Sequence, residues 1–247
     1  MNIQLLSDLH LEYHRDYGVG FIASLDPTGV DVLVLAGDIS IVQRGRLQAV
    51  LELFCDKYPQ VVLVAGNHEY FNGSVGDTQA ALCALDANLP NLHWLENRTC
   101  TIGGQRFVGT TMWFPDLPDG LNKYYSQGMP DFHAIDGFKP WVYKQNKAAT
   151  AFLTATVQPG DVVVTHHIPC IEGVHPRWLP DHHGFGRFFI NQMPQDTLRT
   201  PALWFYGHTH DSMAFQLGGC RFFCNPLARA HEPNMAFNDK LIVDPAQ

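Results

Sequence analysis

The sequence has no run of basic residues and few charges overall. Lys and Arg never stand next to one another, and 16 Lys and Arg against 24 Asp and Glu leave a formal net charge of −8. Proteins that hold DNA or RNA without sequence specificity need a basic stripe, because neutralising phosphates supplies most of that affinity. The composition therefore argues against nucleic acid as the main partner.

The patterns of secreted, disulfide-bonded and membrane proteins are also missing. The six cysteines are scattered, without a CxxC pair. No apolar stretch approaches the roughly 20 residues that cross a bilayer, and no signal-peptide core precedes the first apolar run. We therefore expect a cytoplasmic protein in a reducing compartment, with no membrane association and no disulfide framework.

One pattern does occur, five times: an apolar run rich in β-branched residues, followed at once by side chains able to bind metal. The runs cover residues 3–6, 32–37, 61–66, 162–165 and 203–207. They lead, in order, to Asp8 and His10, to Asp38, to Asn67 and His68, to His166 and His167, and to His208 and His210. Continuous apolar runs of this length are typical of strands with both sheet faces covered.

Segments of helical period separate several of these runs. Amphipathic helices are predicted at residues 47–58, 77–89 and 143–157. Shorter strands are predicted at residues 93–95, 105–111, 213–217 and 221–224. Strands that alternate with helices indicate an α/β protein whose ligands bind beyond the carboxyl ends of the strands. We expect the polar strand ends to converge there; the alternative is that they only cap turns.

Two segments, 115–140 and 169–194, are rich in Pro, Gly and aromatics and have no clear period. We expect them to be loops over the site rather than linkers, so that residues 1–247 form one domain. Four polar side chains of the second loop either contact substrate or lie on a solvated face: Arg177, His182, His183 and Arg187. Four aromatic side chains are expected to pack within loops rather than stack on a base: Trp113, Phe114, Tyr124 and Tyr125.

The residues after the strands form short motifs, namely Asp8-Leu9-His10, Gly37-Asp38, Gly66-Asn67-His68-Glu69, His166-His167 and Gly207-His208-Thr209-His210. In this order they resemble the five signature motifs of the calcineurin-like metallophosphoesterases. Cys224-Asn225-Pro226 resembles the Asn-Pro that often follows the last motif in small bacterial-type members. The resemblance implies an α/β fold with a two-sheet mixed β sandwich flanked by helices, in four αββα layers.

The resemblance also implies a site for two metal ions. One ion would be bound by Asp8, His10, Asp38 and His210. The other would be bound by Asp38, Asn67, His166 and His208, with Asp38 bridging ions about 3.5–4 Å apart. Ligands without thiolate suit divalent or trivalent Mn, Fe or Zn and do not distinguish among them. His167 is expected to hydrogen-bond behind the ligands.

The function implied is hydrolysis of a small phosphomonoester or phosphodiester by a hydroxide that bridges the two ions. Asp38 holds both ions in this scheme. His68 is not a ligand in the family pattern, so we expect it to face the substrate and to stabilise the transition state or protonate the leaving oxygen. Two other functions stay open: a non-catalytic binding module on the same fold, and a di-metal hydrolase of a non-phosphorus bond.

Overall fold

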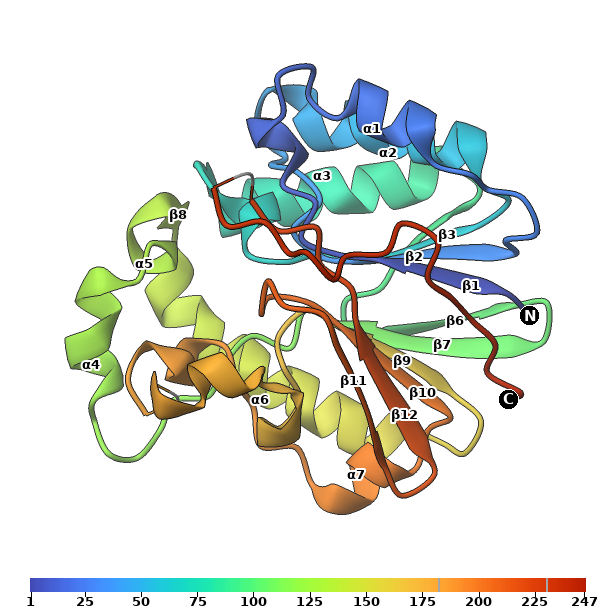
Figure 1. Cartoon of the computed structure of the whole chain (residues 1–247). Helices are drawn as coiled ribbons and strands as arrows, with labels where there is room; N and C mark the ends of the chain where they lie inside the picture. The colour runs from blue at the N-terminus through green and yellow to red at the C-terminus, as the bar shows by residue number, and fades with distance from the viewer. Residues whose placement is uncertain (182, 230) are drawn as a thin grey trace.

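The computed structural model describes residues 1–181, 183–229 and 231–247. His182, one of the loop side chains considered above, lies outside the described residues. Two β-sheets pack against each other, and helices cover the outer face of each (Figure 1). This four-layer αββα arrangement confirms the fold class expected from the sequence.

The first sheet is parallel except at one edge. Its strands lie in the order β13 (Ile242–Val243), β1 (Ile3–Leu6), β2 (Val32–Ala36), β3 (Val61–Val64) and β5 (Leu92–Trp94). Only β13 pairs antiparallel with its neighbour. The parallel strands β1, β2 and β3 therefore end at the same edge of the sheet.

The second sheet is mixed, with an antiparallel strand at each edge. Its strands lie in the order β11 (Met213–Leu217), β12 (Cys220–Cys224), β10 (Leu203–Tyr206), β9 (Val162–Thr165), β7 (Gln105–Thr110) and β6 (Arg98–Ile102). β9 and β10 are parallel neighbours at its centre. A separate short sheet pairs β4 (Gly73–Ser74) with β8 (Ile135–Asp136).

Alternate residues of one strand enter different cores. In β2, Val32 and Val34 pack between the two sheets, whereas Leu33 and Leu35 face the helices. All four are fully buried. A strand covered on both faces needs an apolar side chain at every position, which explains the continuous runs in the sequence.

Helices α1 (Val19–Ser24), α2 (Arg46–Lys57) and α3 (Val75–Asn88) cover the first sheet, and α6 (Phe138–Thr156) and α7 (Gln195–Arg199) cover the second (Figure 1). The buried face of α2 consists of Leu47, Val50, Leu51 and Phe54. This confirms the helix predicted at 47–58. Among the described residues, no helix is long and apolar enough to cross a membrane.

Three helices differ from what the sequence pattern indicated. The helix predicted at 143–157 begins instead at Phe138, so Pro140 stands in its first turn. Proline is tolerated there because the first amide hydrogens of a helix have no partner within it. The segment 115–140 contains α4 (Asn122–Tyr125) and α5 (Asp131–Ala134), which are too short to show a helical period.

Candidate metal centre and its cavity

The seven side chains predicted as metal ligands lie together beyond the ends of β1, β2, β3, β9 and β10. Their ligand atoms form two groups within which all atoms lie within 4.8 Å of one another: Asp8, His10, Asp38 and His210, and Asp38, His166 and His208. Asn67 joins the second group, since its Oδ1 lies 3.3 Å from His166 Nε2. The structure brings together every predicted ligand, and their binding of metal stays a prediction.

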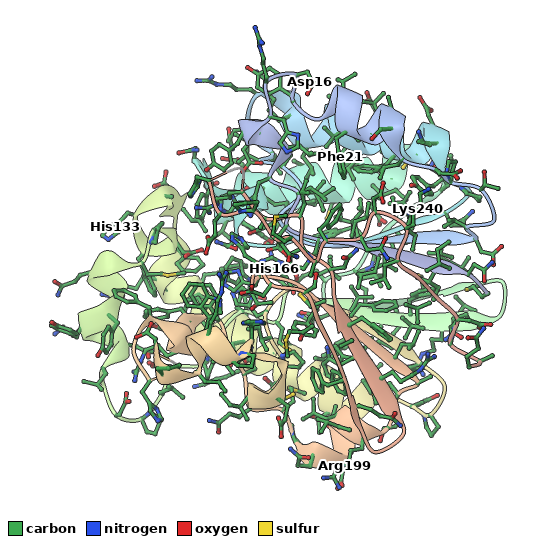
Figure 2. All side chains as sticks on the ribbon, in the orientation of Figure 1. Asp16, Phe21, His133, His166, Arg199 and Lys240 are labelled. Atoms are coloured by element: carbon green, nitrogen blue, oxygen red, sulfur yellow. The ribbon has the colours of Figure 1, made fainter. Side chains whose placement is uncertain are left out.

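His166 marks the position of this cluster in the molecule. Figure 2 shows it near the centre, where the two sheets meet, whereas Asp16, His133 and Arg199 lie at the periphery. His166 is fully buried. A buried group of imidazoles and carboxylates needs either internal pairing or a bound cation, because isolated charges are expensive to desolvate.

The backbone bends sharply at this edge. Asp8, His10, Asp38, His208 and His210 have left-handed conformations, with φ of 49°, 46°, 56°, 68° and 56°. Such values are uncommon outside glycine and store about 1–3 kcal/mol each. Strain of this kind concentrates at functional sites, and here it turns the side chains toward one point.

Two motif glycines let the strand ends approach. Gly37 has φ 87°, and a Cβ on it would lie 2.3 Å from Nδ1 of His166. A Cβ on Gly66 would lie 2.2 Å from Oδ1 of Asp38. Both distances are far inside van der Waals contact, so the motifs require glycine at these positions.

Glu69 holds the loops after β2 and β3 together. Its carboxylate accepts backbone N–H bonds from Asp38 at 3.0 Å, Ile39 at 2.7 Å and Gly66 at 2.6 Å. Burial raises the pKa of Glu69 to about 7, although these hydrogen bonds oppose the rise. The sequence motif contains Glu69 but did not indicate this role.

The donor set fits two cations. Nε2 of His10 lies 3.0 Å from Nε2 of His210, and Nε2 of His166 lies 3.1 Å from Nδ1 of His208. Because Nδ1 of His166 faces the Ala36 carbonyl at 2.9 Å, that nitrogen carries the proton and Nε2 keeps its lone pair. Ring nitrogens this close, with carboxylates around them, are placed to share a metal ion.

Asp38 faces both groups. Its Oδ2 lies 3.9 Å from Nε2 of His10, and its Oδ1 lies 3.5 Å from Nε2 of His166. One oxygen toward each group is the arrangement expected of a bridging carboxylate.

Burial also sets the protonation of the cluster. Desolvation, followed by the carboxylates of Glu69 and Asp8, raises the pKa of Asp38 well above its usual range. Desolvation lowers the pKa of His10 and His208 well below theirs. Neutral imidazoles can donate a lone pair, and crowded carboxylates favour a bound cation.

His68 stands beside the cluster between two side chains that the sequence did not indicate. Its Nδ1 donates to Oε1 of Glu12 at 2.7 Å, and its Nε2 accepts from Nη2 of Arg229 at 2.7 Å. Its ring stacks on Phe71, with centroids 4.3 Å apart. Glu12 follows His10 by two residues, the same spacing that separates His10 from Asp8, and this spacing is the one sequence signal for it.

Arg229 reaches the site through the Asn-Pro segment. The Asn225 side chain donates to the Leu5 carbonyl at 2.8 Å, and Ala228 N donates to the Asp8 carbonyl at 3.0 Å. This pairing lays the chain along the end of β1. No periodic signal marks Arg229, because its position depends on contacts more than 200 residues away in sequence.

A cavity of about 330 Å³ opens onto the cluster. Its polar end is lined by Asp38, Asn67, His68, His208, His210 and Arg229. The rest of the wall is largely apolar and aromatic: Phe71, Met129, Ile168, Val174, Trp178, Phe185, Phe189 and Ile190. Both segments expected to lie over the site, 115–140 and 169–194, contribute to this wall.

Of the loop side chains that the structure describes, Arg177, His183 and Arg187 do not line the cavity. The Arg187 guanidinium, nearly fully buried, donates to both carboxylate oxygens of Asp119 at 2.9 and 2.8 Å. Arg177 donates from Nε to Asp211 at 2.8 Å. His183 is exposed and lies outside the cavity wall. Arg187 thus ties the two covering segments together, and the cation that faces the cavity is Arg229.

Four further candidate side chains do not line the cavity: His167, Trp113, Phe114 and Tyr124. His167 is buried, its Nδ1 lies 3.2 Å from the Thr111 carbonyl, and its ring packs against those of His166 and His208. Its support of the ligands stays a prediction. Trp113 and Phe114 are fully buried in the core that faces the helices. Tyr124 is 68% exposed and does not line the cavity.

Fold and cluster together define a four-layer α/β protein with a buried group of side chains that could hold metal ions. A family model described as calcineurin-like phosphoesterase matches residues 1–212, so the chain belongs to that family. No protein of curated function matches the chain by sequence.

Solved structures resemble the chain in fold at low identity. The phosphopantetheinyl hydrolase of Mycobacterium tuberculosis is 18% identical with a TM-score of 0.73, over 94% of this chain and 90% of that one. The protein TT1561 of Thermus thermophilus is 12% identical with a TM-score of 0.58, over 91% and 88%. A dimetal phosphatase from Danio rerio is 14% identical with a TM-score of 0.50, over 91% and 86%.

Proposed function

We propose that the protein hydrolyses a small phosphomonoester or phosphodiester with two bound transition-metal ions of Mn, Fe or Zn. The observation that supports this most is Asp38, whose two oxygens face two separate groups of ligand atoms at the floor of one cavity. The family supports phosphoester chemistry. Two neighbours in fold are named as a phosphopantetheinyl hydrolase and a dimetal phosphatase, which agrees with this class of reaction.

When bound, the ions supply Lewis-acid activation of water and neutralise charge on the phosphoryl oxygens. The chain's own residues complete the site around them. Arg229 lines the cavity at the cluster, and its Nε has no hydrogen-bond partner among the described residues although it is buried. We assign this guanidinium to the phosphoryl oxygens, since Arg binds such oxygens through paired N–H donors.

We assign His68 to the leaving oxygen or to charge in the transition state. Glu12 holds its Nδ1 proton, so Nε2, which accepts from Nη2 of Arg229 in the absence of substrate, is the atom that would exchange a proton or a hydrogen bond once Arg229 turns to the phosphoryl oxygens. Desolvation, followed by the charge of Arg229, lowers the pKa of His68 well below its usual range. A positioned proton donor or acceptor of this kind contributes about 10²–10⁴ in rate.

The size of the substrate follows from the cavity. About 330 Å³ is at the lower end of small-molecule sites, which span roughly 300–1,000 Å³. The wall of the cavity carries Arg229 as its only Lys or Arg among the described residues. A long polyanion would therefore find few cationic partners here.

The six cysteine thiols are free, and a reducing cytoplasmic location remains part of the proposal.

The test is hydrolysis of p-nitrophenyl phosphate and bis(p-nitrophenyl) phosphate by protein supplemented with Mn, Fe or Zn. We expect turnover of at least one ester and up to two metal ions per chain by elemental analysis. The Asp38→Asn variant should lose most of its turnover and most of its bound metal, because this one side chain faces both groups of ligand atoms. Asp56→Asn, an exposed acid on α2, is the matched control and should change neither.

A folded, metal-supplemented protein that contains no metal would contradict the proposal. Two metals without turnover of either ester would instead favour the binding module. Turnover of an amide or carboxylic ester with both phosphoesters untouched would favour a hydrolase of a non-phosphorus bond.

A further inference from the structure

Asp131 is a buried carboxylate that the proposed chemistry does not use. It is the first residue of α5, is 1% exposed, and lines the cavity. Neither of its side-chain oxygens meets a hydrogen-bond donor among the described residues. A buried carboxylate without donors is unfavourable by several kcal/mol in general, so its persistence at a cavity wall points to a donor that arrives with a ligand.

The groups that face Asp131 do not supply this donor. Burial raises the pKa of Asp131 to about 6, and the rise is opposed by its own backbone N–H and by the Asn67 amide, neither of which has hydrogen-bond geometry to either oxygen. Arg229 also acts on Asp131 through its charge, while its Nη2 donates to His68. The Arg229 guanidinium is thus held at His68 rather than at Asp131.

The rest of the cavity favours positive charge. Asp181 and Glu232 also line the cavity. Glu232 forms an ion pair with Arg177, with Oε1 3.4 Å from Nη2. Phe71, Phe185 and Phe189 also line the cavity, and the rings of Phe71 and Phe189 stack on His68 and His208. Several carboxylates on one cavity attract an ammonium group and repel a second phosphate or carboxylate, and a free aromatic face adds to that attraction.

We propose that the substrate is a phosphoester of an amino alcohol or aminoalkyl phenol, whose protonated amine binds the Asp131 carboxylate while the phosphoryl group lies at the cluster. This inference rests on the phosphoester hydrolysis proposed above and names its substrate class. A protonated primary amine supplies N–H donors to both orphan oxygens, which a quaternary ammonium does not. Asp131 is therefore a specificity-determining residue.

The test uses two phosphonates that bind without being hydrolysed: 4-(aminomethyl)benzylphosphonate and 4-ethylbenzylphosphonate. They differ in one ammonium group against one methyl group. In calorimetric titration of the metal-supplemented protein we expect the amine to bind at least about tenfold more tightly, the effect of a charge-assisted hydrogen bond. Asp131→Asn should reduce this ratio to near one while metal content is kept. Asp136→Asn, an exposed acid close by on β8, should preserve the ratio.

Four outcomes would overturn the inference. Equal affinities in the unmodified protein, or binding of neither phosphonate, would show that the cavity does not select an amine. A preference that survives in Asp131→Asn would show that another group selects it. Loss of metal in Asp131→Asn with an unchanged ratio would make Asp131 a support for Asn67. Tight amine-selective binding without turnover of any phosphoester would leave this inference standing and contradict the proposed hydrolysis.

Discussion

Two regions of the site are built in different ways: the carboxyl ends of the strands, which carry the predicted ligands (the edge), and the lining of the cavity above them (the wall). At the edge, parallel strands with buried backbones deliver the ligand side chains, and tight backbone turns and motif glycines aim them. On the wall, short helices and loops from distant segments contribute mainly apolar side chains. The edge has little freedom because it belongs to two packed sheets. The wall is held by a few specific contacts, of which the pair between Arg187 and Asp119 is one.

This difference separates chemistry from selectivity. Groups that must keep their geometry to a fraction of an ångström sit on rigid elements, and groups that choose the substrate sit on segments that sequence change can remodel. Changes at the edge should therefore remove metal and activity together. Changes on the wall should alter substrate affinity and leave metal content alone.

The largest expected effect is at the edge, from Gly66→Ala. The added methyl would meet Oδ1 of Asp38 at 2.2 Å and Cε1 of His166 at 2.7 Å. We expect metal content and phosphoesterase activity to fall to near background, with the unfolding free energy lowered by about 1–3 kcal/mol from overpacking. Elemental analysis and thermal unfolding measure both.

Gly76→Ala is the matched control for this substitution. Gly76 lies in the first turn of α3, and a Cβ there meets nothing within 4 Å. Alanine should be neutral or slightly stabilising at this position, with normal metal content. A Gly66→Ala protein that keeps two metals and full activity would show that the strand ends can relax around an added methyl group, and that they are no more rigid than the wall.

The second effect separates metal binding from transition-state contacts. His68→Ala and Arg229→Met should each keep metal and lose about two or more decades of kcat, because both groups act on the substrate. Since Nη2 of Arg229 donates to Nε2 of His68, the two losses should not add in the double variant. Steady-state kinetics of the four proteins, with metal content measured on each, test this.

Additive losses would mean that the two side chains act independently despite their contact. Loss of metal in His68→Ala, with activity restored by excess metal, would make His68 a support for the metal cluster instead.

The sequence predicted the edge well for a physical reason. Strands covered on both faces must be apolar at every position, so the five runs were recognisable. The residues after parallel strands lie at the carboxyl end of their sheet, and here the ends of β1, β2 and β3 meet those of β9 and β10. Helix α2 was equally clear, because its buried face repeats with the helical period. The strand β6 gave no such signal: Arg98–Ile102 is an edge strand with mostly exposed polar side chains. It forms because β7 offers it partners.

The wall was predicted less well because the direction of a loop side chain depends on its partner. Arg187 and Arg177 stood in the correct segment, yet each turns to a carboxylate, on Asp119 and Asp211. Nothing in the local sequence distinguishes a cation that contacts substrate from one that ties two loops. Arg229 and Asp131 do face the cavity, but distant chain segments place them there, so their local sequence does not indicate it either.

The smallest expected effect is on the wall, from Arg187→Met. Methionine keeps much of the apolar volume and removes the bonds to Asp119, so the segments 115–140 and 169–194 should separate more easily. We expect faster proteolysis within these segments and a KM a fewfold higher, with kcat and metal content unchanged. Arg199→Met, an exposed arginine on α7 far from the wall, is the control (Figure 2). A loss of metal in Arg187→Met would show that the wall also holds the metal ligands in place, so that metal binding and substrate affinity are not separable.

The same pair gives a pH dependence with a definite sign. Hydrogen bonds from Arg187 lower the pKa of Asp119 to about 2, from an ordinary value of 3.8. A depressed carboxyl pKa stabilises the folded state above the unfolded value, and this contribution is lost as the pH falls through the folded value. The tie should therefore hold fully above pH 3.8 and weaken between there and about 2. Pulsed proteolysis of the wall across this window should show increasing cleavage in the unmodified protein and a flatter profile in Asp119→Asn. Equal profiles in the two proteins would mean that the bonds between Arg187 and Asp119 do not hold the wall closed.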